Sequence, residues 1–367
     1  MNILLVEPPF PVPHKSKNHK HFFPIGLLKI GSYHKRLGDS VQLVRRDLPK
    51  KKIFFDPDIV MVSSLFTYWS GYVARTVRHY KRLFPGARVV VGGIFASLMP
   101  DECQRVTECD EVYVGLYKGG IAEMERIDFS LLPEDVDYQV IHASRGCPRR
   151  CPFCGVWKIE PRFTWKSSIR NEIVKPKLIF YDNNLLANPR IENILGEIIE
   201  FRFSKGTPYS RYQVKCESQS GLDGRILEEK PHLARLLKKA RFHTPRIAWD
   251  GPVSEHKRIQ NQVQILLSAG YRAKDIFVFM LYNYTITYEE LKQKLDFCWR
   301  WKVRVADCRF RPLNSLFDNY MPQAKAQTRG SYYIHPDWTD GEIRAFRREV
   351  RRQNIAIMFG LPKGVVC

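Results

Sequence analysis

Three cysteines lie close together between residues 144 and 155, and their spacing is suited to holding a metal centre. Three residues separate Cys147 from Cys151, and two separate Cys151 from Cys154. Pairing as disulfides would leave one odd thiol and would close strained small rings. Thiolates at this spacing, on a loop that contains Pro148 and Pro152, can instead converge on one metal centre.

The number of cysteines decides which metal centre fits best. A closed zinc site needs a fourth ligand, and no nearby His or Cys provides one. A 4Fe–4S cluster is usually held by four cysteines, so three would leave one iron open to a ligand that is not protein. The pattern favours this open iron site, and a zinc loop or three structural thiols are the alternatives.

The spacing C-x3-C-x2-C, with the aromatic Phe153 before the last cysteine, resembles the cluster loop of the radical S-adenosylmethionine (SAM) superfamily. The resemblance covers about residues 138–314. It implies that Cys147, Cys151 and Cys154 hold three irons of a 4Fe–4S cluster, and that SAM chelates the fourth. It also implies an electron donor such as flavodoxin or ferredoxin, because one electron cleaves SAM to a radical that abstracts hydrogen from the substrate.

Alternating strand and helix patterns follow from Tyr138 onward and predict the elements that position this site. The expected strands are residues 139–143, 178–181, 212–216, 246–249, 276–281 and 303–310. The expected helices are residues 189–203, 222–239, 255–268 and 288–301. Six strands with helical crossovers suggest a partial (β/α)6 barrel, which is also the fold that the resemblance implies.

Polar residues follow the expected strands, at the end where parallel barrels carry their active sites. Asp182 and Asn183 resemble the family's Asp-Asp-Asn stretch, which implies contact with the SAM amino group. Asp250 stands where the family often has Glu, and Pro312, which follows the sixth strand, is a further candidate contact for the cofactor. Glu217 is the other candidate for the SAM ribose or methionine end, because carboxylates accept strong hydrogen bonds. At each acidic position a helix cap or a surface acid is the alternative.

The first 125 residues show a second alternation of apolar runs and helical stretches. The expected strands are residues 3–6, 41–44, 59–62, 88–91 and 111–114, and the expected helices lie near 25–37, 71–84 and 97–106. Strands that alternate with helices predict a parallel sheet covered on both faces. Five strands fit a flavodoxin-like or Rossmann-like doubly wound sheet, whose ligands bind beyond the carboxyl ends of the strands.

Two pairs of small residues, Ser63-Ser64 and Gly92-Gly93, follow strands of this expected sheet. Paired glycines after a strand let the backbone approach a ligand closely. With Pro8-Pro9 and Gly26-Leu27-Leu28, these loops resemble the cobalamin-binding domain that precedes many radical SAM domains. The resemblance covers most of residues 1–120 and implies that Ser63, Ser64, Gly92 and Gly93 contact cobalamin.

The chain departs from that pattern at four places, one of which is the short segment 45–57. Phe95 stands at the usual His position, Gly115-Leu116 replaces the usual Gly-Glu, and the Asp-x-His-x-x-Gly motif is missing. The sequence therefore leaves cobalamin occupancy open. The alternative is a sheet that only packs against the rest of the protein.

Charge and hydropathy limit the environment and the partners. The 367 residues include 59 Lys and Arg but 38 Asp and Glu, which gives a net charge of +21. Such a field attracts polyanions and anionic ligands, so an anionic substrate or nucleic acid is one candidate partner and a merely basic surface is the alternative. No apolar run approaches membrane-spanning length, and the first residues lack the pattern of a signal peptide. A cytoplasmic protein with reduced thiols is expected.

The predicted organisation has four parts: a cobalamin-binding-like Rossmann domain (1–125), a linker (126–137), a radical SAM partial barrel (138–315) and a C-terminal helical extension (316–367). Residues 339–352 of the extension predict a helix with an apolar stripe of Ile343, Phe346 and Val350 and a basic face that includes Arg344.

The expected function is that of a radical SAM enzyme, with cobalamin-dependent methyl transfer to an unactivated carbon as the favoured reaction. Two alternatives stay open. One is a cobalamin-free radical SAM enzyme that catalyses cyclisation or rearrangement, and the other is a nucleic-acid-binding protein with a structural cluster.

Replacing Cys147, Cys151 or Cys154 by Ala should abolish cluster binding, because each thiolate is expected to hold one iron. Anaerobically reconstituted parent protein should carry about four irons per chain at this site and absorb at ~420 nm. Iron analysis and SAM cleavage measure the loss. Retained iron together with retained SAM cleavage in all three variants would contradict the assignment.

Overall fold

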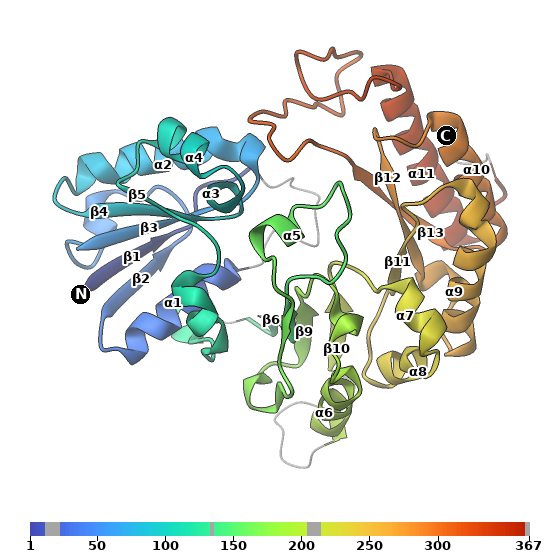
Figure 1. The fold of residues 1–367 in the computed structure, drawn as a ribbon, viewed down its shortest axis with the longest axis horizontal. Helices are drawn as coiled ribbons and strands as arrows, with labels where there is room; N and C mark the ends of the chain where they lie inside the picture. Colours follow the sequence, from blue (N-terminus) through green and yellow to red (C-terminus); the bar gives the residue numbers. More distant parts are fainter. Residues whose placement is uncertain (12–22, 133–135, 204–213, 364–367) are drawn as a thin grey trace. The chain divides into compact units, whose positions relative to one another are not determined.

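The structure is a computed structural model that describes residues 1–11, 23–132, 136–203 and 214–363 (Figure 1). The chain divides into two compact units, each an α/β structure. Unit 1 consists of Met1–Val136, Cys154–Pro161 and Pro312–Asp318. Unit 2 consists of Asp137–Phe153, Arg162–Arg311 and Asn319–Cys367.

Unit 1 is built on a parallel five-stranded sheet in the order β2-β1-β3-β4-β5. The strands are β1 (Asn2–Val6), β2 (Ser40–Val44), β3 (Ile59–Ser64), β4 (Arg88–Gly93) and β5 (Glu111–Tyr113). This is the flavodoxin-like order of a doubly wound sheet, so the expected fold of this region is confirmed. Apolar residues of the central strands are fully buried, which explains their runs of Val, Ile and Leu.

Among the described residues, four α-helices accompany this sheet: α1 (Ile25–Arg36), α2 (Ser70–Leu83), α3 (Ile94–Leu98) and α4 (Pro100–Thr107). The single helix expected over residues 97–106 is in fact interrupted at Met99. Pro100 explains the break, because proline disfavours helical geometry in the residue before it and is well suited to begin a new helix.

The stretch expected as a linker, residues 126–137, is largely part of unit 1. Leu131 is buried, and the backbone N–H of Asp128 donates to the hydroxyl of Ser32 in α1 at 2.8 Å. Just before it, the buried ammonium of Lys29 donates to the carbonyls of Glu123 and Glu125. The chain here is therefore fastened to α1, and unit 1 continues past the expected boundary at residue 125.

Two later segments complete unit 1. Thr67 donates from its hydroxyl to the carbonyl of Ser315 at 2.6 Å, and Leu316 packs on the core of unit 1. In the other segment, a Cβ placed on Gly155 would lie 3.5 Å from Leu98 of α3. The expected barrel region (138–315) contains all of residues 154–161 and the first part of residues 312–318. The predicted domain boundaries therefore differ from the observed units at these two segments.

Unit 2 contains two parallel three-stranded sheets, in the orders β6-β9-β10 and β11-β12-β13. Its strands are β6 (Tyr138–Ile141), β9 (Lys177–Phe180), β10 (Lys215–Ser218), β11 (Arg246–Ala248), β12 (Phe277–Tyr282) and β13 (Arg304–Arg309). Parallel bridges join Cys216 to Phe242 and Leu222 to Ile247, which connects the two sheets. All six expected strands are present, although the expected residues 212 and 213 lie outside the described chain.

Helices follow the strands of unit 2 as expected: α6 (Ile191–Phe203), α7 (Gly224–Glu229), α8 (His232–Lys239), α9 (His256–Ser268) and α10 (Tyr288–Arg300). The helix expected over 222–239 is divided between α7 and α8. Pro231, which lies between them, explains the division, because it cannot donate the backbone hydrogen bond that would continue α7.

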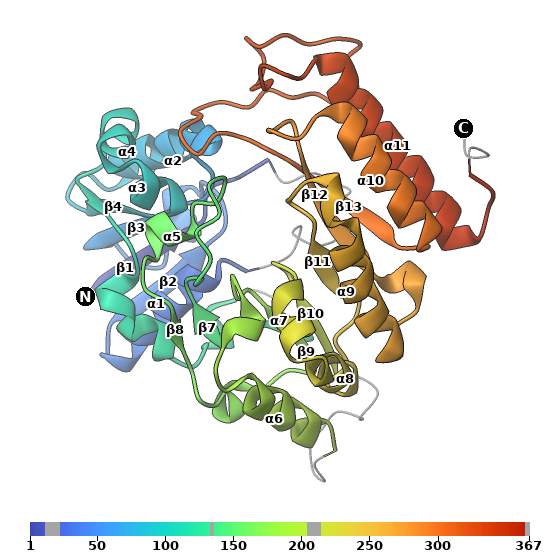
Figure 2. The same ribbon diagram turned by 45° about the vertical axis from the view of Figure 1, so that its right-hand side comes forward.

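The last helix, α11 (Asp340–Phe359), lies beside α10 (Figure 2). Thr339 and Glu342 form a capping box at its start, and Ile343, Phe346 and Val350 are buried as expected.

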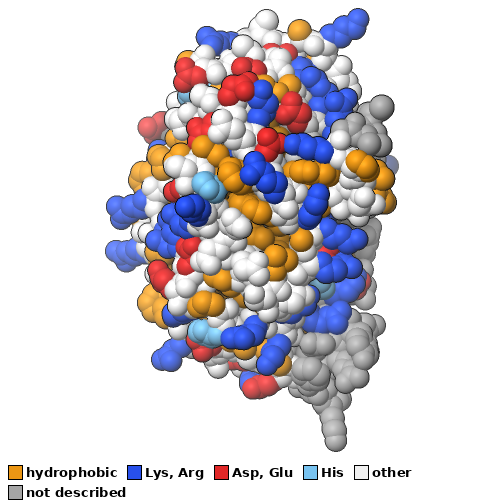
Figure 3. Space-filling view, turned by 90° about the vertical axis from the view of Figure 1, so that its right-hand side faces the viewer, with side chains coloured by type: hydrophobic (Ala, Val, Ile, Leu, Met, Phe, Trp, Pro, Cys, Tyr) orange, Lys and Arg blue, Asp and Glu red, His pale blue; other side chains and the backbone are white. Residues whose placement is uncertain are grey.

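Arg344, expected on the basic face of this helix, is instead buried. It donates to Asp340 at 2.8 Å and to the carbonyl of Ala324 at 2.7 Å, so its charge is used inside unit 2. The exposed arginines of the helix are Arg348, Arg351 and Arg352. Figure 3 shows Lys and Arg side chains spread among apolar ones on the face that carries α10 and α11.

No helix in the described part of the chain is both long and apolar enough to cross a membrane.

Candidate functional site

The cysteine loop (residues 146–163) begins and ends at a small pair of antiparallel strands. Ser144 and Arg145 form β7 (Ser144–Arg145) and pair with β8 (Thr164–Trp165). Gly146 opens the loop with a φ of 73°, a backbone conformation that glycine adopts at little cost. The two strands therefore fix where the loop leaves and rejoins unit 2.

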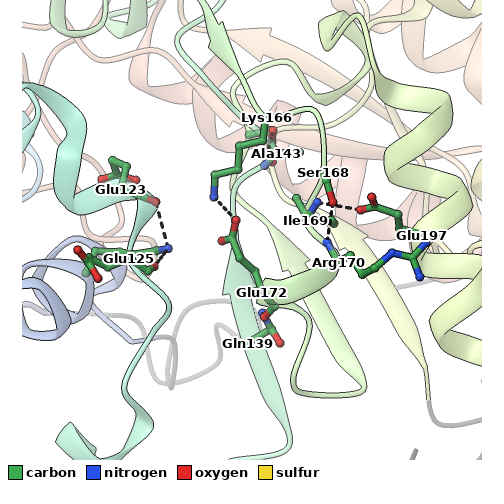
Figure 4. A network of polar contacts seen from close by, with 12 residues as sticks. Glu123, Glu125, Gln139, Ala143, Lys166, Ser168, Ile169, Arg170, Glu172 and Glu197 are labelled. Atoms are coloured by element: carbon green, nitrogen blue, oxygen red, sulfur yellow. Dashed lines mark hydrogen bonds and ion pairs between the residues drawn. The ribbon is translucent and has the colours of Figure 1, made fainter. Parts of the chain in front are cut away.

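The chain that leaves β8 is also fixed by polar contacts, which Figure 4 shows. The ammonium of Lys166 pairs with Glu172 at 2.6 Å, and the side-chain amide of Gln139 on β6 donates to the carbonyl of Glu172 at 2.9 Å. The backbone N–H of Ile169 donates to the carboxylate of Glu197 on α6 at 2.8 Å. These bonds tie the second end of the cysteine loop to β6 and α6.

The three cysteines of the loop are each partly exposed. The backbone N–H of Arg149 donates to Sγ of Cys147 at 3.4 Å, a contact that suits a thiolate ligand. Cys147 and Cys151 belong to unit 2, whereas Cys154 belongs to unit 1 with the short helix α5 (Val156–Ile159). Across the described residues, no group of three or more His, Cys, Asp or Glu side chains is arranged to hold a metal ion. Convergence of the three thiolates on one centre stays a prediction from the sequence.

Asp182, at the carboxyl end of β9, is fully buried and binds the two residues that lead toward the cysteine loop. Its two oxygens accept from the backbone N–H of Ala143, each at 3.1 Å, and Oδ1 accepts from the hydroxyl of Ser144 at 2.6 Å. Burial raises the pKa of this carboxyl to about 6, although the bonds from Ser144 and Ala143 act in the opposite direction. Its observed role is to hold β7 against β9, and its expected contact with SAM stays a prediction.

Two polar atoms that follow the neighbouring strands β9 and β10 lack partners within the described structure. Asn183 is half-buried, and next to it the fully enclosed Oδ1 of Asn184 receives no hydrogen bond. Gln219, which follows β10, has a buried Nε2 that donates none. A buried polar atom without a partner costs about 1–3 kcal/mol, so this acceptor and this donor are each a candidate contact for a ligand.

Glu217 on β10 is already paired. Its carboxylate forms an ion pair with Arg246 on β11, and Arg246 also donates to the carbonyl of Ser218 at 2.7 Å. The expected contact of Glu217 with SAM would have to share this carboxylate with Arg246.

The remaining predicted contacts for SAM lie in different units. Asp250 is exposed and follows β11 in unit 2. Its loop is held by the buried ammonium of Lys294 on α10, which donates to the carbonyls of Trp249 at 3.2 Å and Gly251 at 2.5 Å. Pro312 begins the segment that belongs to unit 1.

The carboxyl edge of unit 1 gives Ser63 and Ser64 different roles. The hydroxyl of Ser64 donates to the carbonyl of Gly92 at 2.8 Å and accepts from the backbone N–H of Ala96 at 3.1 Å. Ser64 therefore links β3 to β4 and to α3. The Oγ of Ser63 is buried, and the described chain offers it no hydrogen-bond partner. Ser63 is thus the serine of this pair whose hydroxyl has no hydrogen-bond partner among the described residues.

The two glycines at this edge also differ. Gly93 has a φ of 103°, and a Cβ there would lie 2.3 Å from the carbonyl oxygen of Ser64, so a side chain would require the backbone to shift. Gly92 would bring a Cβ to an ordinary 3.7 Å from Tyr113. Phe95, at the family's usual His position, is fully buried in the core of unit 1.

Sequence reasoning missed an aromatic cluster at the same edge. Phe10 follows β1, and Phe66, Tyr68 and Trp69 follow β3. Phe10 stacks on Trp69 with ring centroids 5.2 Å apart, and Phe66 stacks on Tyr68 at 5.0 Å. The signal in the sequence was the run of aromatic residues directly after Ser63-Ser64-Leu65.

Sequence reasoning also missed Asp223. This residue caps α7, and its side chain is almost fully buried. Burial by itself would raise its pKa, but the hydrogen bonds from Arg149 and Asn184, together with the charge and hydrogen bond of Arg225, hold the pKa below its usual value. An Asp before a helix is a common cap, so nothing in the sequence distinguished it.

Comparison with known proteins supports the interpretation of unit 1. Residues 21–124 match the family model of the B12 binding domain. A solved structure similar to this chain is the 1.5 Å crystal structure of a novel cobalamin-binding protein from Desulfitobacterium hafniense DCB-2, at 19% identity and a TM-score of 0.22. The match covers 30% of this chain and 51% of that chain, so this chain spans about half of its length. That TM-score is too low to carry an argument about fold.

Comparison with curated proteins gave no match. The B12 binding domain match supports cobalamin binding by residues within unit 1. It does not extend to the cysteine loop or to unit 2.

Asp182→Asn should flatten the dependence of stability on pH between about pH 4 and about pH 6. Because the folded chain holds the Asp182 proton more tightly than the unfolded chain, this residue's contribution is full below about pH 4 and is lost as pH rises through about 6. The expected change is about 2 kcal/mol. Urea unfolding at both ends of this range measures it. The exposed Asp337→Asn is the matched control, and a parent-like slope in Asp182→Asn would show that the shift is absent.

Proposed function

We propose that this protein is a radical SAM enzyme that uses cobalamin to methylate an unactivated carbon. The observation that carries the proposal is the combination, in one chain, of a B12 binding domain match at residues 21–124 and a C-x3-C-x2-C loop that follows strand β6. The first supports a methyl carrier, and the second resembles the loop of a superfamily whose radicals activate carbon–hydrogen bonds.

The carboxyl edge of unit 1 has features that fit cobalamin. The unpartnered hydroxyl of Ser63 would bind a polar group of the cofactor, and Gly92, which has no side chain, would let the cofactor approach the backbone closely. Ser64 and Gly93 would not contact the cofactor themselves. They would hold the ends of β3 and β4 together, since they pair with one another across the two strands. When bound, cobalamin would supply the group that carries the methyl.

The cysteine loop and its neighbours in unit 2 have features that fit an iron–sulfur cluster and SAM. The N–H of Arg149 faces Cys147, as expected for a sulfur that carries negative charge. The free acceptor of Asn184 suits the ammonium of SAM, and the free donor of Gln219 suits its carboxylate. When bound, the cluster and SAM would supply the radical that abstracts hydrogen from the substrate.

An anionic substrate is part of the proposal. The net charge of +21 supports it, as do Arg348, Arg351 and Arg352, which remain exposed on α11 after Arg344 has been used internally. Nucleic acid, the other anionic partner considered, would bind in a manner that weakens steeply with salt.

Ser63→Ala should weaken cobalamin binding without loss of stability. Removing an unpartnered buried hydroxyl costs the fold nothing, whereas a lost ligand hydrogen bond costs about 1 kcal/mol or more, at least a fivefold loss of affinity. Titration with hydroxocobalamin, followed by its visible spectrum, measures binding, and thermal unfolding measures stability.

Ser64→Ala is the matched control, because its hydroxyl is used between β3, β4 and α3. It should lower stability by about 1–3 kcal/mol and leave the affinity of the folded protein less affected than Ser63→Ala does. The same binding in Ser63→Ala as in the parent would remove this serine from the site. Absence of cobalamin binding by the parent would favour the cobalamin-free radical SAM enzyme.

Gln219→Met should weaken SAM binding by reconstituted protein, because it removes the buried donor while keeping the volume of the side chain. The expected loss is about tenfold, from one hydrogen bond to a charged group. Equilibrium dialysis with labelled SAM measures it, and formation of 5′-deoxyadenosine under reducing conditions should fall in parallel. Gln293→Met, on the exposed face of α10, is the control. Equal SAM binding by both variants would contradict a role for Gln219.

A further inference from the structure

Arg149 lies between the first two cysteines of the loop and makes two contacts that point in different directions. Its backbone N–H donates to Sγ of Cys147 at 3.4 Å. Its side chain donates from Nε to Oδ2 of Asp223, 2.9 Å away at the start of α7. Fixing the side chain of Arg149 therefore also restricts the direction of the amide that faces Cys147.

Asp223 is built to hold that side chain. Its carboxylate is only 6% exposed, and Oδ2 also accepts from the side-chain amide of Asn184 at 3.0 Å. The other oxygen, Oδ1, accepts from the backbone N–H and from Nε of Arg225, at 3.2 and 3.1 Å. With both oxygens used, the carboxylate has little freedom to turn, and Arg149 and Asn184 are held on the same atom.

The same contact affects Asn184. Because the amide nitrogen of Asn184 is committed to Asp223, the orientation of its side chain is set, and the buried Oδ1 that has no partner in the described chain faces away from that bond. One carboxylate thus fixes both a loop residue next to Cys147 and a candidate ligand-binding acceptor at the end of β9.

We propose that Asp223 is the positioning residue of the cysteine loop. It holds Arg149 so that the amide of Arg149 donates to Cys147, and it orients Asn184 with the same oxygen. This inference rests on the proposed function, because its consequence concerns the cluster that the loop is expected to bind. Charge-assisted hydrogen bonds of this kind are stronger than neutral ones, and groups that bond to ligand sulfurs tune the reduction potential of a cluster.

Asp223→Ser tests the anchor first in the metal-free full-length chain. Serine keeps the cap on α7 but removes the charge that holds Arg149. Trypsin must take the Arg149 side chain into its own pocket, so cleavage after Arg149 should rise about tenfold relative to cleavage after Arg150 when local opening becomes easier. Mass spectrometry at early times measures the ratio. An unchanged ratio would overturn the anchor, whether or not the protein binds a cluster.

Arg225→Gln is the matched control, since it removes an exposed partner of the same carboxylate and leaves Arg149 bound. Trypsin should cleave this variant after Arg149 and after Arg150 in the same ratio as it cleaves the parent. Asp223→Asn provides a second variant, and thermal unfolding verifies that each variant is folded before digestion. If trypsin cleaves after Arg149 as fast in Arg225→Gln as in Asp223→Ser, the faster cleavage comes from general loosening of α7 and not from the loss of Arg149 binding.

Anaerobic reconstitution then tests the consequence for the cluster. Asp223→Ser should retain less iron than the parent and shift the midpoint potential of the cluster to a lower value, because the sulfur of Cys147 loses a fixed donor. Asp223→Glu should restore part of both properties. A parent-like iron content and potential in Asp223→Ser would overturn the positioning role. A parent that binds no cluster would refute the proposed function, and the protease ratio would still decide the anchor.

Discussion

The bonds that Asp182 receives at the end of β9 are the constraint on which the proposed site in unit 2 depends. A fully buried carboxylate without partners would be very unfavourable, so Ala143 and Ser144 must stay in place to satisfy it. These two residues lead directly into the cysteine loop. The fold of unit 2 and the start of the loop are therefore coupled through one side chain.

The strands were the part of the fold that sequence predicted best. Runs such as Ile3–Val6 and Val89–Val91 are almost continuously apolar, as buried parallel strands require. Helices were predicted well in position but not in continuity, because Pro100 and Pro231 divide two of them. The prediction that Arg344 lies on the exposed basic face of its helix was wrong for a different reason. Its helical position is near the edge of the apolar stripe, and only the fold brings Asp340 and the carbonyl of Ala324 within reach of it.

The candidate site was predictable in location but not in the use of each atom. Neighbouring residues of a strand point to opposite faces, so Ser63 and Ser64 cannot be equivalent, yet the sequence does not say which hydroxyl the fold uses. The same applies to the carboxylates. Asp182 was predicted from the resemblance and Glu217 from its carboxylate chemistry. Each is bound to a residue distant in sequence, Asp182 to Ser144 and Glu217 to Arg246. The unpartnered atoms of Asn184 and Gln219 appear only when every hydrogen bond is counted.

The way the chain passes between the two units has a consequence for how the protein is made. Unit 1 includes residues 312–318, with Leu316 against its core and Ser315 bound by Thr67. A ribosome must therefore synthesise most of unit 2 before unit 1 has all of its parts. Contacts between residues so far apart in sequence form late, since the intervening chain has to be closed into a loop first. A fragment that stops at residue 136 would lack these parts, so dividing this protein for separate expression calls for cuts that respect its spatial units.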